Sequence, residues 1–149
     1  MRLFFILSFL SFSLLINTQT EQIQIPDSES IVGIWRQTGI ENPFTGEFIA
    51  TISGNYKVIS PDGTFFTFVT WPSNDPKKGT AIGQYGNYEV KSDSIMIEKI
   101  IKHVLTPNLS GKNATIKYNL VDKETLMMAW ENEKGFWINE EWTRLPLSR

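Results

Sequence analysis

Three polar tripeptides that favour tight turns constrain this fold more than any other feature of the sequence. They are Pro-Asp-Gly at 61–63, Ser-Asp-Ser at 92–94 and Asp-Lys-Glu at 122–124, and each separates two runs rich in β-branched and aromatic residues. Proline fixes one turn angle, while Asp-Gly provides a side-chain hydrogen bond and a positive φ. Each tripeptide therefore predicts a β-hairpin, in which two consecutive strands lie side by side.

The same pattern predicts eight strands and no helix of useful length. The strand-like runs are 31–38, 55–60, 64–71, 81–91, 95–101, 115–121, 125–131 and 136–144. Successive hairpins favour an up-and-down barrel, because closing the sheet removes its exposed edges. An open sandwich needs long crossovers, and only the loop at 39–53 is long enough for one. The fold class that we expect is all-β, an eight-stranded antiparallel up-and-down barrel.

The loop at 39–53 is much longer than the tight turns that join the other strands. Its middle part, 47–52, could pair briefly with a neighbouring strand. Because it carries Phe44, Phe48 and Ile49, we expect this loop to cover an apolar opening at the mouth of the barrel.

The amino-terminal segment differs in kind from the rest of the chain. Arg2 is its only charge, a short apolar run follows, and polar residues with small side chains lead out of it. This pattern is typical of a cleaved secretory signal peptide. We therefore expect a signal peptide at 1–20, an extended lead-in at 21–29 and the barrel domain at 30–149. The protein is then secreted or periplasmic without a membrane span, and the absence of cysteine argues against a lipoprotein.

Composition argues against several classes of partner. The chain has 14 Lys and Arg against 16 Asp and Glu, and its largest basic cluster is Lys77-Lys78, so we expect no nucleic acid partner. His103 is the only histidine, cysteine is absent, and a lone histidine is poor support for a metal site. No phosphate-binding loop or Ser-His-Asp arrangement is present, so we expect no metal and no cofactor. The position of His103 at the end of a strand predicts a surface residue.

Two motifs on the first and last predicted strands form a closure pair. They are Gly33-Ile34-Trp35 and Trp142-Thr143-Arg144. A large indole can seal one end of a barrel, and a guanidinium over its face adds a cation–π contact. The pair resembles the lipocalin and wider calycin pattern, in which a Gly-x-Trp tryptophan packs under an arginine of the final strand. The predicted closure residues of this lipocalin-like barrel are Gly33, Trp35, Trp142 and Arg144.

A narrower resemblance covers most of the mature chain. The matching stretches are 33–37, 56–65, 86–90, 98–100 and 140–144. They resemble an uncharacterised lipocalin-like family of exported bacterial proteins, a domain of unknown function. The resemblance implies the fold and no particular activity.

The lumen of such a barrel is the predicted binding site. Strand alternation and the position of one carboxylate among apolar residues select the lining side chains. The predicted ligand-binding residues are Tyr56, Phe66, Phe68, Tyr88, Glu98, Met128 and Trp130. We expect a small apolar or amphipathic ligand in this lumen.

Two other functions stay open at this point. In the first, the barrel is filled by its own side chains and its loops bind a protein or a glycan. In the second, the protein is a small barrel enzyme in which Glu98 is a general acid or base and Tyr88 positions it. The structural alternative for Glu98 is a carboxylate paired with Arg36, Arg144 or a tyrosine. The sequence predicts neither the ligand's identity nor the oligomeric state.

Overall fold

The computed structural model describes residues 30–51, 54–70 and 79–146, so the predicted signal peptide and lead-in lie outside it. The described residues form nine strands and one short 3-10 turn. The strands are β1 Gly33–Glu41, β2 Phe48–Ala50, β3 Asn55–Ile59, β4 Thr64–Thr70, β5 Thr80–Ser92, β6 Ile95–His103, β7 Asn113–Leu120, β8 Thr125–Glu131 and β9 Trp137–Arg144. The 3-10 turn, η1 Pro107–Leu109, lies between β6 and β7.

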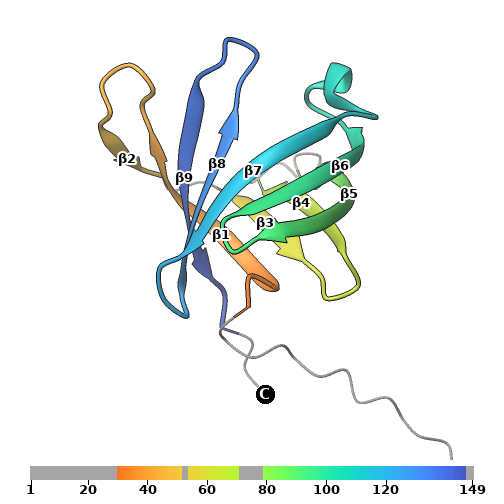
Figure 1. The fold of residues 1–149 in the computed structure, drawn as a ribbon, viewed down its shortest axis with the longest axis horizontal. Coiled ribbons are helices and arrows are strands. Elements are labelled where there is room, and N and C mark those ends of the chain that lie inside the picture. Colours follow the sequence, from red (N-terminus) through yellow and green to blue (C-terminus); the bar gives the residue numbers. More distant parts are fainter. Residues whose placement is uncertain (1–29, 52–53, 71–78, 147–149) are drawn as a thin grey trace, which may run out of the picture.

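All strand pairs are antiparallel, and they confirm the predicted fold class. The sheet runs β2-β1-β3-β4-β5-β6-β7-β8-β9, and an additional β1–β9 pairing closes it into an eight-stranded up-and-down barrel (Figure 1). Strand β2 is a short arm that pairs only with the outer half of β1. No helix among the described residues has the length and apolar character needed to cross a membrane.

The two ends of the barrel differ. At one end, called the closed end here, lie the three tight turns predicted from the sequence and the start of β1 (Figure 1). At the other, the open end, lie the β1–β2 hairpin, the β6–β7 connection with η1 and the β8–β9 turn. The strands therefore carry side chains from a sealed floor towards a rim of longer connections.

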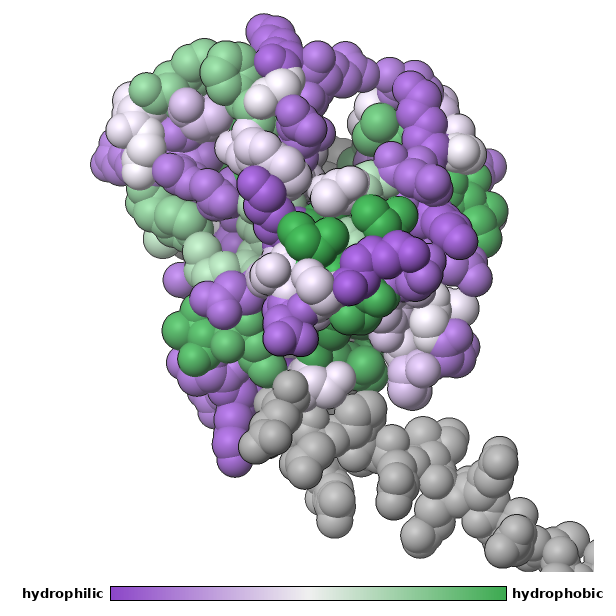
Figure 2. Space-filling model, viewed as in Figure 1, coloured by the Kyte–Doolittle hydropathy of each residue, from purple (hydrophilic) through white to green (hydrophobic). Residues whose placement is uncertain are grey.

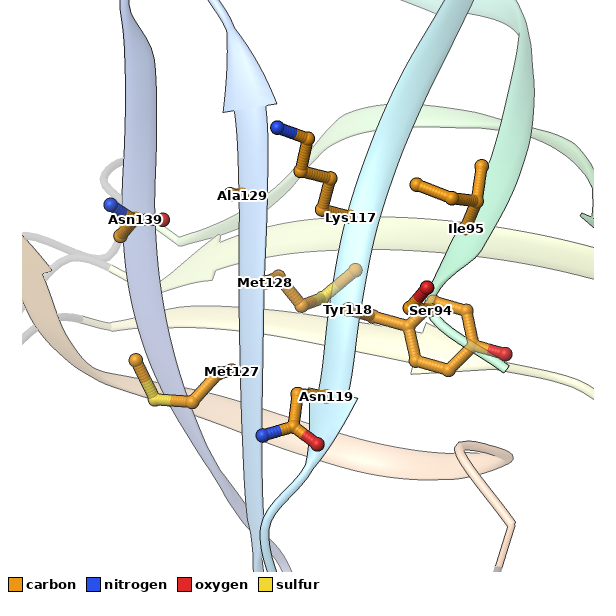
Figure 3. Close-up of a pocket in the computed structure, with 9 residues that line it drawn as sticks. All are labelled: Ser94, Ile95, Lys117, Tyr118, Asn119, Met127, Met128, Ala129 and Asn139. Carbon is orange, nitrogen blue, oxygen red and sulfur yellow. The ribbon is translucent and has the colours of Figure 1, made fainter. Parts of the chain in front are cut away.

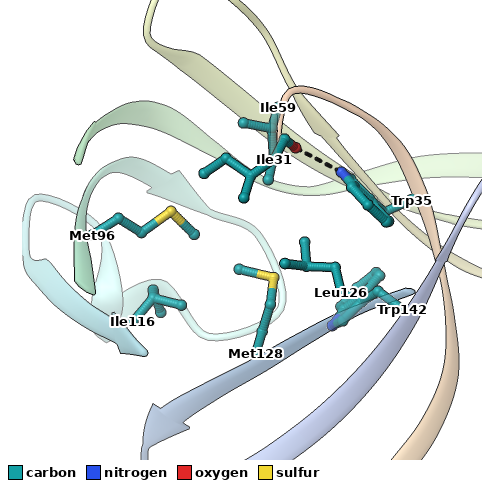
Figure 4. Close-up of a cluster of buried hydrophobic side chains, with 8 residues drawn as sticks. All are labelled: Ile31, Trp35, Ile59, Met96, Ile116, Leu126, Met128 and Trp142. Atoms are coloured by element: carbon teal, nitrogen blue, oxygen red, sulfur yellow. Dashed lines mark hydrogen bonds between the residues drawn. The ribbon is translucent and has the colours of Figure 1, made fainter. Parts of the chain in front are cut away.

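Trp35 forms the floor at the closed end and is fully buried. Its Nε1 donates to the carbonyl oxygen of Ile31 at 2.8 Å, and Arg144 Cζ lies 4.1 Å from the centre of its ring. A Cβ at Gly33 would lie 2.6 Å from the Arg144 guanidinium, and the φ of +155° at Gly33 is one that side chains rarely adopt. The predicted contact of Trp35 with Arg144 is therefore present. The floor is completed by a cluster of buried side chains, namely Ile31, Ile59, Met96, Ile116, Leu126, Met128 and Trp142 (Figure 4).

The barrel wall divides near the open end between β7 and β8. Their pairing stops at Ile116 and Trp130, so residues 113–115 of β7 pair only with β6. Figure 2 shows a gap here, roofed by hydrophilic residues. The roof includes a hydrogen bond of 2.8 Å from Asn108 Nδ2 to Glu133 Oε1, which joins the η1 connection to the β8–β9 turn. We call this gap the side window.

Residues 39–51, the described part of the predicted loop, are mostly a hairpin. Strand β1 continues to Glu41, and β2 pairs back onto it, in agreement with the brief pairing expected at 47–52. The hairpin lies at the open end (Figure 1), and it pairs with residues 39–41 of β1, beyond Trp35 along the strand. Its side chains do not form the expected apolar cover, because Phe44 is 81% exposed and Phe48 and Ile49 are also exposed. Phe44 instead contacts Phe136 of the β8–β9 turn, with ring centroids 6.2 Å apart.

Candidate functional site

Polar and charged side chains enter the lumen above the apolar floor. Lys57 of β3 and Glu98 of β6 are both buried, at 5% and 2% exposure. Glu140 of β9 points inward with its alternating neighbours Ile138 and Trp142, which are buried. These three charged groups come from strands spaced around the wall. They form the candidate site.

Lys57 and Glu98 form an ion pair across the inside of the barrel. Lys57 Nζ also lies 5.3 Å from the centre of the Phe65 ring, a buried neighbour on β4. The contact joins Lys57 Nζ directly to Glu98 Oε1, so the lysine ammonium is the partner of this buried oxygen. Isolated charges are very costly to bury, and the pair exists because each group compensates the other.

Glu140 is held by two neutral donors. Trp130 Nε1 donates to its Oε1 at 3.0 Å, and Trp142 Nε1 donates to its Oε2 at 3.1 Å. Burial raises the pKa of the Glu140 carboxyl above its ordinary value, while both indoles and the Lys57 ammonium favour its charged form. The nearby carboxylate of Glu98 raises this pKa further. Burial is the dominant cause.

A second polar pair lies in the lumen towards the open end. Asn55 Nδ2 donates to Gln37 Oε1 at 2.8 Å, and Gln37 is buried at 6% exposure. Trp130 is inward-facing and yet 37% exposed, because it stands at the base of the side window. The open half of the lumen is thus lined by hydrogen-bonding groups and one accessible indole.

Three of the predicted lining residues face the wrong way. Tyr56, Phe66 and Phe68 lie on the outside of the wall, where the Tyr56 and Phe68 rings stack with centroids 4.8 Å apart. Their strands are apolar on both faces, so alternation alone does not choose the inward one. Lys57 and Phe65 take the inward positions instead, because the buried ion pair places that face of β3 in the lumen.

The other four predicted residues lie on the inner face. Met128 belongs to the floor cluster, and Trp130 and Glu98 lie above it. Tyr88 packs against the floor, but its hydroxyl donates to the Ser60 carbonyl oxygen at 2.8 Å and not to Glu98. Tyr88 therefore does not donate to Glu98 in this structure, although the two residues are paired in the β5–β6 ladder.

Sequence reasoning missed Lys57 and Glu140 as site residues. Lys57 alternates with Tyr56, which is predicted to face inward, so the prediction leaves Lys57 out. The partner of Glu98 is Lys57 rather than the expected Arg36, Arg144 or tyrosine. Glu140 stands between Ile138 and Trp142 on an inward face that alternation does predict. The sequence signal for the site was therefore the position of the Glu140 carboxylate between two apolar residues of the same strand face.

Two further features lie outside the lumen. A shallow depression of about 360 Å³ covers the outer face of β6 to β9, where Lys117, Met127 and Asn139 alternate with inward residues (Figure 3).

His103 is half-buried rather than fully on the surface. Its Nδ1 accepts a hydrogen bond from the Thr106 N–H at 3.0 Å, and burial lowers the pKa of its imidazole. No cluster of three potential metal ligands occurs within the described ranges.

Residues 30–149 match the model of a family described as a domain of unknown function, DUF4488, and the chain belongs to this family. Among solved structures, the chain is similar to a redesigned beta barrel. The two share 15% identity with a TM-score of 0.49, over 80% of this chain and 95% of the designed one. No curated protein matches the sequence.

Proposed function

We propose that this barrel binds a small amphipathic molecule in the open half of its lumen. The observation that carries the proposal is the convergence of Lys57, Glu98 and Glu140 above an apolar floor. A barrel selected only for stability can fill this space with apolar side chains, which avoids the cost of burying charges. Apolar walls with a few convergent polar groups are typical of small-molecule sites.

Access to the site supports the same proposal. Trp130 faces inward and is partly exposed, because the side window opens beside it. A ligand that enters by the window or the open end meets Trp130 and Glu140 before it reaches the floor. Its apolar part then contacts the floor, and its polar group remains near the charged side chains.

Binding of a neutral fluorescent probe, N-phenyl-1-naphthylamine, tests this proposal. Ala114 lies on the inner face of β7 opposite Glu98, and Thr115 is the next residue and points outward. We expect the probe to bind the wild-type protein, Ala114→Trp to weaken binding at least tenfold, and Thr115→Trp to leave it unchanged. If Ala114→Trp does not fold, Ala114→Leu takes its place. Equal binding by the Ala114 and Thr115 variants would contradict a lumenal site.

We also propose that the protein is exported and related to the lipocalins. The pattern at residues 1–20 supports export to the periplasm or beyond the cell, and the contact of Arg144 with Trp35 supports the lipocalin relationship. The mass of the protein recovered from its host tests export. A mature chain that has lost about the first twenty residues is expected, and a full-length intracellular chain would contradict export.

The outer aromatic face favours one alternative, an interaction protein. Tyr56, Phe66 and Phe68 lie beside Ile82 and Tyr85, which are 51% and 40% exposed. Exposed apolar patches of this kind mark binding surfaces for proteins or glycans. This surface is on the barrel wall and not on the loops. Phe68→Ser is expected to abolish binding on a glycan array or in a protein pull-down, while lumenal probe binding stays unchanged.

A further inference from the structure

The charges inside the open half of the lumen do not balance. Lys57 provides one positive charge, while Glu98 and Glu140 provide two negative charges when both are ionised. Lys57 is in contact with Glu98, and no salt bridge to Glu140 occurs within 30–51, 54–70 and 79–146. The two groups that contact Glu140 directly are neutral indole N–H donors. While Glu140 is ionised, these three groups therefore carry one net negative charge.

The two carboxylates differ in their partners. Lys57 Nζ contacts Glu98 Oε1 directly, whereas the described partners of Glu140 are two indole N–H groups. An ammonium group carries several N–H donors and a positive charge, so it can pair with Glu140 as Lys57 pairs with Glu98.

Trp130 adds an aromatic surface beside the carboxylate. Its indole donates to Glu140 and is 37% exposed at the base of the side window. A carboxylate next to an accessible indole favours organic cations, because the indole attracts a cation and the carboxylate pairs with it. A carboxylate ligand such as a fatty acid is disfavoured here, since it meets two carboxylates and a lysine that is already paired.

We propose that the ligand is an amphipathic amine whose protonated nitrogen pairs with Glu140 beside Trp130. This inference rests on the proposed function and specifies the ligand's head group. The charged groups that act on Glu140 are Lys57 of β3 and Glu98 of β6, and its contacts on β8 and β9 are the two indoles. A bound cation holds Glu140 ionised, so binding releases a proton wherever the free carboxyl is partly protonated.

Three probes with one phenylalkyl chain test the head group by isothermal titration calorimetry at neutral pH. They are 4-phenylbutylamine, 4-phenylbutanol and 4-phenylbutanoate. We expect the amine to bind at least tenfold more tightly than the alcohol, and the carboxylate to bind more weakly than the alcohol. Near the pKa of Glu140, amine binding in two buffers of different ionisation enthalpy is expected to show proton release.

Glu140→Gln and Glu141→Gln form a matched pair of variants. Both remove one negative charge from β9, but Glu141 faces outward, where its Oε1 accepts from Thr38 Oγ1 at 2.9 Å. Glu140→Gln is expected to weaken amine binding at least tenfold and to remove the preference for the amine over the alcohol, while Glu141→Gln leaves both affinities unchanged. If Glu140→Gln does not fold, the wild-type ranking of the three probes decides.

The outcomes separate this inference from the proposed function. If the alcohol or carboxylate binds the wild-type protein as tightly as the amine, the proposal of a cationic head group is overturned. The proposal of a lumenal binding site would still stand. Retention of the amine preference by Glu140→Gln also overturns the pairing with Glu140. If none of the three probes binds, the proposed function and this inference are overturned together.

Discussion

Arg144 of the last strand covers Trp35 of the first strand, with its Cζ 4.1 Å from the centre of the indole. Its guanidinium also donates to the carbonyl oxygens of Ser30 at 2.6 Å, Val32 at 2.7 Å and Lys123 at 2.7 Å. One side chain thus joins the entry segment, the β7–β8 turn and the floor of the barrel. Arg144 therefore holds these three parts of the closed end together.

Arg144→Met keeps the length of the side chain and removes these interactions. We expect it to lower the free energy of unfolding by about 3 kcal/mol, because three carbonyls lose their donor and the cation–π contact is lost. Urea denaturation measures the change. Arg36→Met is the control, because Arg36 is exposed on β1, and its cost is expected to stay below about 0.5 kcal/mol. Similar costs at both positions would contradict the closure role.

The buried pair of Lys57 and Glu98 is expected to show strong coupling. Lys57→Met or Glu98→Leu alone leaves an uncompensated buried charge and is expected to cost about 3–5 kcal/mol. The double variant is expected to be more stable than either single variant. A double-mutant cycle by chemical denaturation measures this coupling.

The exposed pair of Lys91 and Glu89 provides the matched control for this cycle. Its atoms are 2.5 Å apart, but its side chains are 48% and 51% exposed. Solvent screening is expected to hold its coupling energy below about 1 kcal/mol. Comparable coupling in the two pairs would show that burial does not control the Lys57–Glu98 interaction.

Glu140 is expected to make stability decrease as pH rises. Burial raises its pKa in the folded protein, so between the unfolded and folded pKa values the folded state binds more protons. The stabilisation from protonated Glu140 is present below the unfolded pKa and is lost as pH rises through the folded pKa. Thermal unfolding across this pH range is expected to show the effect in the wild-type protein and not in Glu140→Gln. An identical pH dependence in the two proteins would contradict it.

Gly86 is expected to tolerate no side chain. It lies at an irregularity in the β5–β6 ladder, and a Cβ there would collide with the backbone carbonyl of Lys99. Gly86→Ala is expected to cost about 2 kcal/mol, because a backbone neighbour cannot move aside as a flexible side chain does. Gly79 has no atom within 4 Å of its ideal Cβ, so Gly79→Ala is the control. Differential scanning calorimetry compares the two variants.

The tight turns were predictable because their chemistry is local. Asp62 accepts from Thr64 N at 3.0 Å and from Thr64 Oγ1 at 2.6 Å, and Asp122 accepts from Glu124 N at 2.8 Å. The residues that make these bonds are two apart in the sequence, so composition alone predicts the hairpins. The order of the strands around the barrel follows from these hairpins.

The inner faces were harder to predict, because they depend on distant partners. Lys57 is inside the barrel only because Glu98, on another strand, compensates its charge. Strand β4 carries Phe65 on one face and Phe66 and Phe68 on the other, so both faces satisfy an apolar pattern. Strand β9 is different, because Ile138, Glu140 and Trp142 share one inward face in the way that strand alternation favours.

The β1–β9 ladder has a consequence for how the chain folds. It pairs Trp35 with Arg144, whereas the other barrel ladders join strands that are neighbours along the chain, apart from the small step over β2. Hairpins with few intervening residues form quickly, but joining the two ends of the chain requires closing a very long loop. During synthesis on the ribosome, Trp35 therefore cannot be buried under Arg144 until the last strand has been made. The unsealed sheet, with the edges of β1 and β9 unpaired, is the species most exposed to aggregation.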